Sequence, residues 1–131
     1  MTYLLDVNAL LALGFDQHEH HGRLEKWVGS LPPGDSLATC AITEIGFLRV
    51  LHQVPQYSVS IADGQRLISK LRANRKRTIT FLQDHHGAAD LPTWVKTGRQ
   101  TTDGHLLGLA AAQGALLATL DAGIPGAFLV P

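Results

Sequence analysis

The first fifteen residues place an acid between a short apolar stretch and an apolar helical pattern, and this order constrains the fold more than any other feature of the sequence. Tyr3–Leu5 has the composition of a strand buried on both faces, and residues 9–15 follow with helical spacing. Asp6 stands between the two. In a parallel α/β sheet, ligands bind at the carboxyl ends of the strands, so a carboxylate there is well placed for a cation. Taken alone, capping of the following helix by Asp6 or Asn8 is the simpler explanation.

The same order of strand, acid and helix recurs along the chain. Residues 36–40 are a predicted strand, and the helix predicted over 42–51 carries Glu44 in its first turn. Asp103 lies in the first turn of a later helix, and Asp121 directly follows another buried strand. Because parallel strands end at one edge of a sheet, we expect the four acids to gather there in an α/β fold. The remaining predicted elements are a helix opened by residues 17–21, a helix capped by Ser60, strands at 78–82 and 116–120, a loop over 83–96, a helix ended by Gly114 and a short edge strand at 128–130.

Length and composition predict one globular domain spanning residues 1–131. The sequence is 45% hydrophobic and 17% charged, which is ordinary for a folded domain, and no apolar run approaches the ~20 residues that cross a bilayer. We therefore expect no membrane association and no secretory signal. Cys40 is the single cysteine, which fits a reducing cytosol and a cytoplasmic location.

Positive charge is concentrated in one segment although the net charge is zero. Six of the eleven Lys and Arg residues fall within residues 66–77, a span without an acid. Such a run is commonly a solvated helix face. The alternative, which we carry as a prediction, is that part of the run binds RNA phosphates. The residues concerned are Arg72, Arg75, Lys76 and Arg77.

Four carboxylates in one cleft repel one another unless a cation compensates, and the ligand type indicates which cation. Hard oxygen ligands without Cys or His favour Mg²⁺ or Mn²⁺, which suit phosphoryl chemistry. The histidine-rich stretch at 17–21 offers only His18 and His21 at helical spacing, so a solvated helix start is favoured over a zinc site. Neither a Gly-rich phosphate loop nor a Gly-x-Ser-x-Gly nucleophile elbow is present.

The segments around the four acids strongly resemble the PIN-domain ribonucleases, particularly the VapC-type toxins of bacterial toxin–antitoxin pairs. Each motif is short, so the specificity lies in the complete set, whose order and spacing span nearly the whole chain. The motifs are Leu5-Asp6-Val7-Asn8-Ala9-Leu10-Leu11, residues 43–51 around Glu44, residues 98–106 around Asp103, and Leu117-Ala118-Thr119-Leu120-Asp121.

This resemblance implies a three-layer α/β/α sandwich with a central parallel sheet and Mg²⁺-dependent (or Mn²⁺-dependent) cleavage of RNA. It also implies a homodimer and inhibition by a cognate VapB-type antitoxin. Carried over residue by residue, the metal-binding and catalytic acids are Asp6, Glu44, Asp103 and Asp121. Asn8 and Thr102 match positions that shape the site, and Thr102 is equally explained as a helix cap. The alternative function is a catalytically weak PIN domain that serves as an RNA-binding or protein-interaction module.

Overall fold

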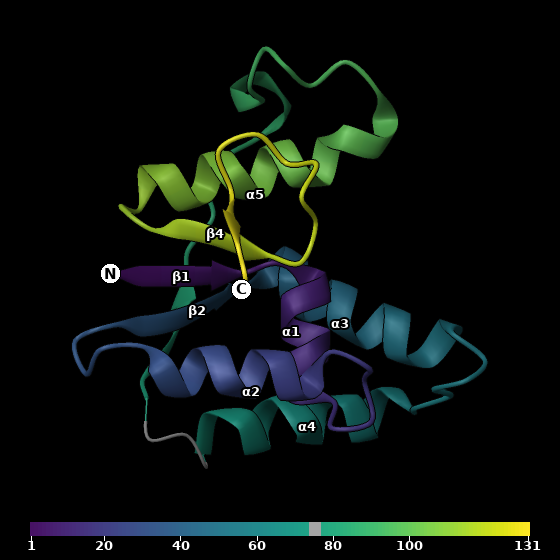
Figure 1. The fold of residues 1–131 in the computed structure, drawn as a ribbon. Helices are drawn as coiled ribbons and strands as arrows, with labels where there is room; N and C mark the ends of the chain where they lie inside the picture. The colour runs from purple at the N-terminus through teal and green to yellow at the C-terminus, as the bar shows by residue number, and fades with distance from the viewer. Residues whose placement is uncertain (74–76) are drawn as a thin grey trace.

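A five-stranded parallel sheet with the order β3-β2-β1-β4-β5 forms the centre of the molecule (Figure 1). The computed structural model describes residues 1–73 and 77–131. From the central strand the chain proceeds to one side through two strands and then crosses to the other side. Strand order therefore reverses between β1 and β4, and ligands of open α/β sheets bind at such a reversal. The strands are β1 (Thr2–Leu5), β2 (Ser36–Cys40), β3 (Ile79–Leu82), β4 (Leu116–Thr119) and β5 (Phe128–Leu129).

Helices cover both faces of the sheet, as the resemblance to PIN domains predicts. Helix α5 lies on one face, and helices α1 to α4 lie on the other (Figure 1). The three-layer α/β/α sandwich is thereby confirmed. The α-helices are α1 (Val7–Gly14), α2 (His21–Ser30), α3 (Ala41–Gln53), α4 (Ile61–Ala73) and α5 (Thr101–Ala112), and two short 3-10 helices are η1 (Ala88–Asp90) and η2 (Gly98–Gln100).

Successive apolar side chains along a strand point alternately into two hydrophobic cores, one on each face of the sheet. In β1, Leu4 packs in the core beneath α5, whereas Leu5 packs in the core beneath the other four helices. In β2, Ala38 packs in the core beneath α5, and Leu37 packs in the core on the opposite face. Because successive side chains of a strand point to opposite faces, a strand covered on both faces is apolar along most of its length. This is why β1, β2 and β4 read as largely apolar runs in the sequence, with Thr39 and Thr119 as buried polar residues.

Two helix starts differ from the sequence-based expectation. Helix α2 begins at His21, because residues 16–20 form turns closed by backbone bonds from His18 N–H to Phe15 O and from His21 N–H to His18 O. Helix α5 begins at Thr101 directly after η2, so Thr102 lies inside the helix and the capping explanation for it is wrong. The expected cap at Ser60 is present, since its hydroxyl accepts from Asp63 N–H at 3.1 Å.

Residues 83–96 lie outside the α-helices and strands and contain one 3-10 helix, η1, which ends at Asp90. The edge strand expected near the C-terminus is β5, which pairs in parallel with β4. Among the residues described, no helix combines the length and the apolar character needed to cross a membrane.

Candidate active site

Asp6 is buried at the carboxyl end of β1, beside the point where strand order reverses. Its side chain is only 5% exposed, and both oxygens accept hydrogen bonds: Oδ1 from Val7 N–H at 2.7 Å and Oδ2 from the Thr119 hydroxyl at 2.7 Å. Burial raises the pKa of Asp6, the bonds from Thr119 and Val7 act against that rise, and the charge of Asp121 adds to it. The carboxylate therefore lies in a poorly solvated position with a second negative charge nearby.

Thr119 connects three of the site residues and was not among the residues singled out from the sequence. While its hydroxyl donates to Asp6, the oxygen accepts from Asn8 Nδ2 at 3.2 Å and from Asp121 N–H at 3.0 Å. Asn8 Oδ1 also accepts from Leu120 N–H at 3.0 Å. The one signal in the sequence is a polar residue at the end of an otherwise apolar strand. Asn8 thus bonds to the end of β4, and the N-cap of α1 is Asp6.

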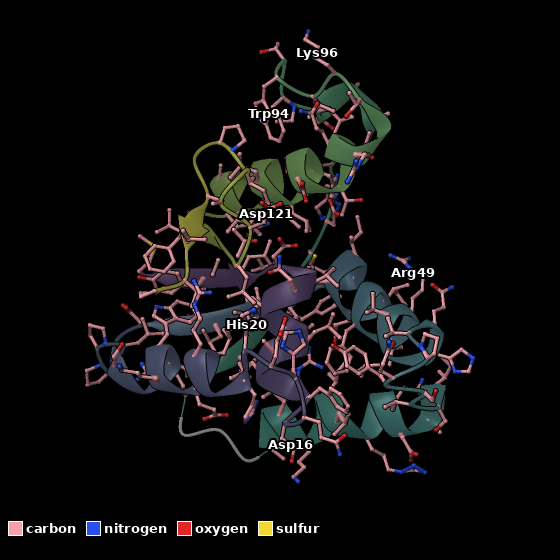
Figure 2. The ribbon with its side chains drawn as sticks, turned by 45° about the vertical axis from the view of Figure 1, so that its right-hand side comes forward. Asp16, His20, Arg49, Trp94, Lys96 and Asp121 are labelled. Atoms are coloured by element: carbon pink, nitrogen blue, oxygen red, sulfur yellow. The ribbon has the colours of Figure 1, made fainter. Side chains whose placement is uncertain are left out.

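Asp103 and Asp121 complete a group of three aspartates from three separate segments. Asp121 lies two residues beyond β4, and its Oδ1 accepts from Gly123 N–H at 2.8 Å (Figure 2 labels Asp121). Burial, followed by the charges of Asp6 and Asp121, raises the pKa of Asp103. Within the described residues, the Asp103 carboxylate has no hydrogen-bond or ion-pair partner. Over residues 1–73 and 77–131, no protein cation therefore pairs with these three acids to compensate their charge.

Glu44, unlike the three aspartates, forms an ion pair with an arginine among the described residues. Its Oε1 lies 2.9 Å from Nη1 of Arg72, in the last turn of α4. Nη2 of the same guanidinium donates to the hydroxyl of buried Thr39 at 2.8 Å. The structure therefore places Glu44 at the same sheet edge as predicted but gives it a different electrostatic partner.

A cleft of about 270 Å³ opens beside the acids. It is lined by the neighbours in sequence of three of them: Val7 next to Asp6, Thr102 next to Asp103, and Ile45 next to Glu44. Ala41, Ile42 and Arg49 complete the lining. Thr102 is thus a wall residue of this cleft, which agrees with a site-shaping role.

The donor set suits a hard divalent cation, although the side chains do not converge on a single coordination point. Asp6, Asp103 and Asp121 supply only carboxylate oxygens, and their mutual repulsion is what a bound cation would relieve. Over residues 1–73 and 77–131, no three His, Cys, Asp or Glu side chains are arranged to hold a metal ion together. This also applies to the histidines near the start of α2, where His18 Nδ1 instead accepts from His20 N–H.

The two described members of the proposed RNA-binding set have protein partners. Arg72 is bound to Glu44 and Thr39. Arg77 donates to the backbone oxygens of Leu31 at 2.7 Å and Pro32 at 2.6 Å, which fixes the loop before β2. Arg75 and Lys76 lie outside the described residues.

A second polar cluster lies on the α5 side of the sheet, and the sequence indicated only loop residues there. Asp84 Oδ2 lies 2.5 Å from His105 Nε2, and Asp84 Oδ1 accepts from His86 N–H at 2.9 Å. Burial alone would raise the pKa of Asp84, but the bonds and charges of His86 and His105 outweigh it and lower the pKa overall. The cluster ties the loop after β3 to α5, the helix that carries Asp103.

Comparison with known proteins identifies the family. A family model described as the PIN domain matches residues 3–126. The chain belongs to the PIN-domain family. Ribonuclease VapC38 of Mycobacterium tuberculosis is 42% identical over 124 residues, which cover 92% of this chain and 86% of that protein. Ribonuclease VapC39 of the same organism is 34% identical over 128 residues, covering 95% of this chain and 91% of that protein. The resemblance to VapC-type PIN domains is therefore confirmed.

Solved structures agree on the fold of this PIN domain. Mycobacterium tuberculosis VapC20, described as a Sarcin-Ricin loop cleaving toxin, aligns with a TM-score of 0.61 at 11% identity, over 98% of this chain and 99% of that one. VapBC2 from Rickettsia felis, bound to a DNA fragment from its promoter, aligns with a TM-score of 0.60 at 16% identity, over 98% of this chain and 97% of that one. At these identities the likeness concerns the fold alone.

Proposed function

We propose that this PIN domain is an endoribonuclease toxin of a type II toxin–antitoxin pair and that it cleaves RNA with the help of Mg²⁺ or Mn²⁺. The observation that carries the proposal is the group formed by Asp6, Asp103 and Asp121. These carboxylates come from distant segments, and the described part of the chain supplies no cation to compensate them, so the group costs stability that only a function explains. VapC ribonucleases among the relatives support RNA as the substrate.

In this proposal the three aspartates hold the cation, and Glu44 is the fourth carboxylate of the set. A bound divalent ion supplies the activation of a water molecule and offsets the negative charge that develops on the phosphate. The protein's own contribution is positioning. The Thr119 hydroxyl fixes the rotamer of Asp6, and the bond from Leu120 N–H to Asn8 holds the segment that leads to Asp121.

We also propose the domain extent, location, oligomeric state and partners of this protein. Residues 1–131 form one PIN domain, which acts in the cytoplasm as a homodimer and is inhibited by a VapB-type antitoxin. The solved VapBC2 pair from Rickettsia felis supports the antitoxin as a class of partner. Arg72, Arg75, Lys76 and Arg77 stay the candidate RNA-binding set.

Removal of one aspartate charge tests the catalytic proposal. Asp6→Asn and Asp103→Asn should each reduce metal-dependent RNA cleavage by more than the roughly 10–100-fold that loss of an outer hydrogen-bond partner costs, because the amide lacks the charge that a hard cation requires. The measurement is single-turnover cleavage of RNA in Mg²⁺ or Mn²⁺, with chelator as the blank.

Asp63→Asn is the matched control, because Asp63 lies exposed on α4 and pairs with Arg66. That variant should cleave at the wild-type rate. Wild-type protein that binds RNA and does not cleave it in either metal would favour the alternative, a PIN domain retained as a binding module.

A further inference from the structure

Arg72 is anchored at two points beside the acidic site, which distinguishes it from an ordinary surface arginine. Nη1 pairs with Glu44 and Nη2 donates to Thr39, so each end of the guanidinium fork has its own partner. Thr39 is 1% exposed and sits within β2, which gives the fork a rigid support. The side chains of Arg72 and Glu44 are 36% and 17% exposed. An exposed single pair contributes little, whereas a planar fork with a buried second partner holds a defined geometry.

This anchoring divides the four acids into two electrostatic groups. Beside burial, the charge of Asp121 raises the pKa of Asp6, and the charges of Asp6 and Asp121 raise the pKa of Asp103. None of these three aspartates has a protein cation among the described residues. Glu44 has its cation within the chain. The guanidinium already neutralises the negative charge of Glu44, so it weakens the attraction of this carboxylate for a divalent ion.

We infer that Arg72 is a positioning residue: it holds Glu44 in an ion pair in the metal-free protein and competes with the divalent cation for this carboxylate. The inference rests on the proposed function, because it concerns the metal site of the same nuclease. Arg72 stabilises the empty site by neutralising one of its four charges, and it lowers the affinity of that site for metal. Glu44 joins the ion only as the guanidinium moves away.

Arg72→Gln tests the competition, because the amide keeps a hydrogen-bond donor and removes the charge. Mn²⁺ binding to the RNA-free protein, measured by isothermal titration calorimetry, should tighten severalfold. Arg72→Lys keeps the charge but not the fork, so it cannot hold Glu44 and Thr39 together, and its affinity should lie between those of wild type and Arg72→Gln. Thermal melting of each variant in chelator checks that the fold is retained.

Two comparisons separate competition for Glu44 from a general loss of positive charge. Arg66→Gln removes a charge from the same helix at a residue paired with Asp63, and it should leave Mn²⁺ affinity unchanged. In a Glu44→Gln background, Arg72→Gln should no longer tighten Mn²⁺ binding, because the carboxylate for which Arg72 and the cation compete has been removed.

The outcomes distinguish this inference from the proposed function. Wild-type protein that binds Mn²⁺ with the same affinity as Arg72→Gln, or more tightly, overturns the competition and leaves the nuclease proposal standing. An equal gain from Arg72→Gln in the Glu44→Gln background also overturns it. Wild-type protein that binds no Mn²⁺ at all overturns both.

Discussion

Asp6 shows that helix capping and site formation are compatible in one side chain. Oδ1 accepts from the first amide of α1, as a capping residue does, and Oδ2 is turned to Thr119 in the site. One oxygen of Asp6 therefore caps α1, and the other accepts the hydrogen bond from Thr119. Asp103 differs, because within the described residues its carboxylate has no hydrogen-bond partner and only like charges act on it.

Because the Asp103 carboxylate has no hydrogen-bond partner within the described residues, its substitution tests the effect of charge on stability by itself. Asp103→Asn in chelator should melt at the wild-type temperature or above, because it loses repulsion from Asp6 and Asp121 without losing a hydrogen bond. Saturating Mn²⁺ should stabilise wild type by ~2.7 kcal/mol at a hundred times the dissociation constant, a rise on the order of 10 °C, and Asp103→Asn by less. The measurement is thermal melting of both proteins with chelator and with Mn²⁺.

The pH dependence in chelator is the internal control of this prediction. The pKa of Asp103 is raised in the folded state from its ordinary value of 3.8, so its unfavourable contribution is complete above the folded pKa. The contribution disappears as pH falls through the folded pKa to below 3.8, where both states are protonated. Any advantage of Asp103→Asn should therefore shrink on acidification. An advantage that is constant across this range would mean that repulsion is not its cause.

At the scale of elements, helix α5 is held against the loop that precedes it by a glycine contact. A Cβ on Gly104 would lie 2.3 Å from Val95 Cγ2 and 3.3 Å from Pro92 Cδ. Gln100 fixes the same loop, since its Oε1 accepts from the amides of Lys96 and Thr97. The outer part of this loop, with Trp94 and Lys96, lies beyond α5 on the side away from the sheet (Figures 1 and 2).

Two alanine substitutions in α5 should have opposite effects. Gly104→Ala should destabilise the protein by roughly 1–3 kcal/mol, because the added methyl group overlaps Val95 beside Asp103. Gly108→Ala, one turn later with nothing within 4 Å, should stabilise it by roughly 0.5–1 kcal/mol through helix propensity. Urea unfolding in chelator measures both. Equal stabilisation by the two substitutions would mean that the loop does not rest on Gly104.

At the scale of the whole molecule, charge is separated although the total is zero. Three aspartates without a cationic partner among the described residues lie at the carboxyl edge of the sheet, whereas Lys and Arg are concentrated over residues 66–77. Under the proposed function the aspartates bind the cation, so RNA would be attracted by other residues. Of the candidate RNA-binding set, Arg72 and Arg77 have protein partners. The next test concerns the other two members, Arg75 and Lys76.

Salt dependence of RNA binding measures the contribution of this pair. Replacing Arg75 and Lys76 by Gln should reduce the slope of log affinity against log salt by about 1.4, two contacts at ~0.7 each for a single strand. The control is Lys26→Gln with Arg66→Gln, which removes the same charge from two other exposed positions. Binding is measured in chelator, so that cleavage does not interfere. A slope that changes equally in both double variants would favour bulk charge over phosphate contacts by the basic run.

The sequence by itself determined the order of elements and the positions of the four acids. Burial on two faces makes β1, β2 and β4 largely apolar, and amphipathic spacing marks the helices, so both signals can be recognised in the local sequence. An acid placed just after such a strand must then lie at the carboxyl edge of a parallel sheet, as Asp6 does directly after β1 and Asp121 does two residues after β4. The beginning of α2 was misplaced because turns over 16–20 are set by backbone bonds that leave no spacing pattern.

Only the tertiary structure decided which side chains act on one another. Glu44 pairs with Arg72 on another helix, Thr119 bonds to Asp6 across 113 positions, and Asp84 meets His105 across 21. No local pattern encodes these partners, because each depends on where two elements pack and on which rotamers the packing leaves. Four acids that are equivalent in the sequence thus become three aspartates that have no cationic partner in the part of the chain that the structure describes, and one glutamate that is paired with an arginine.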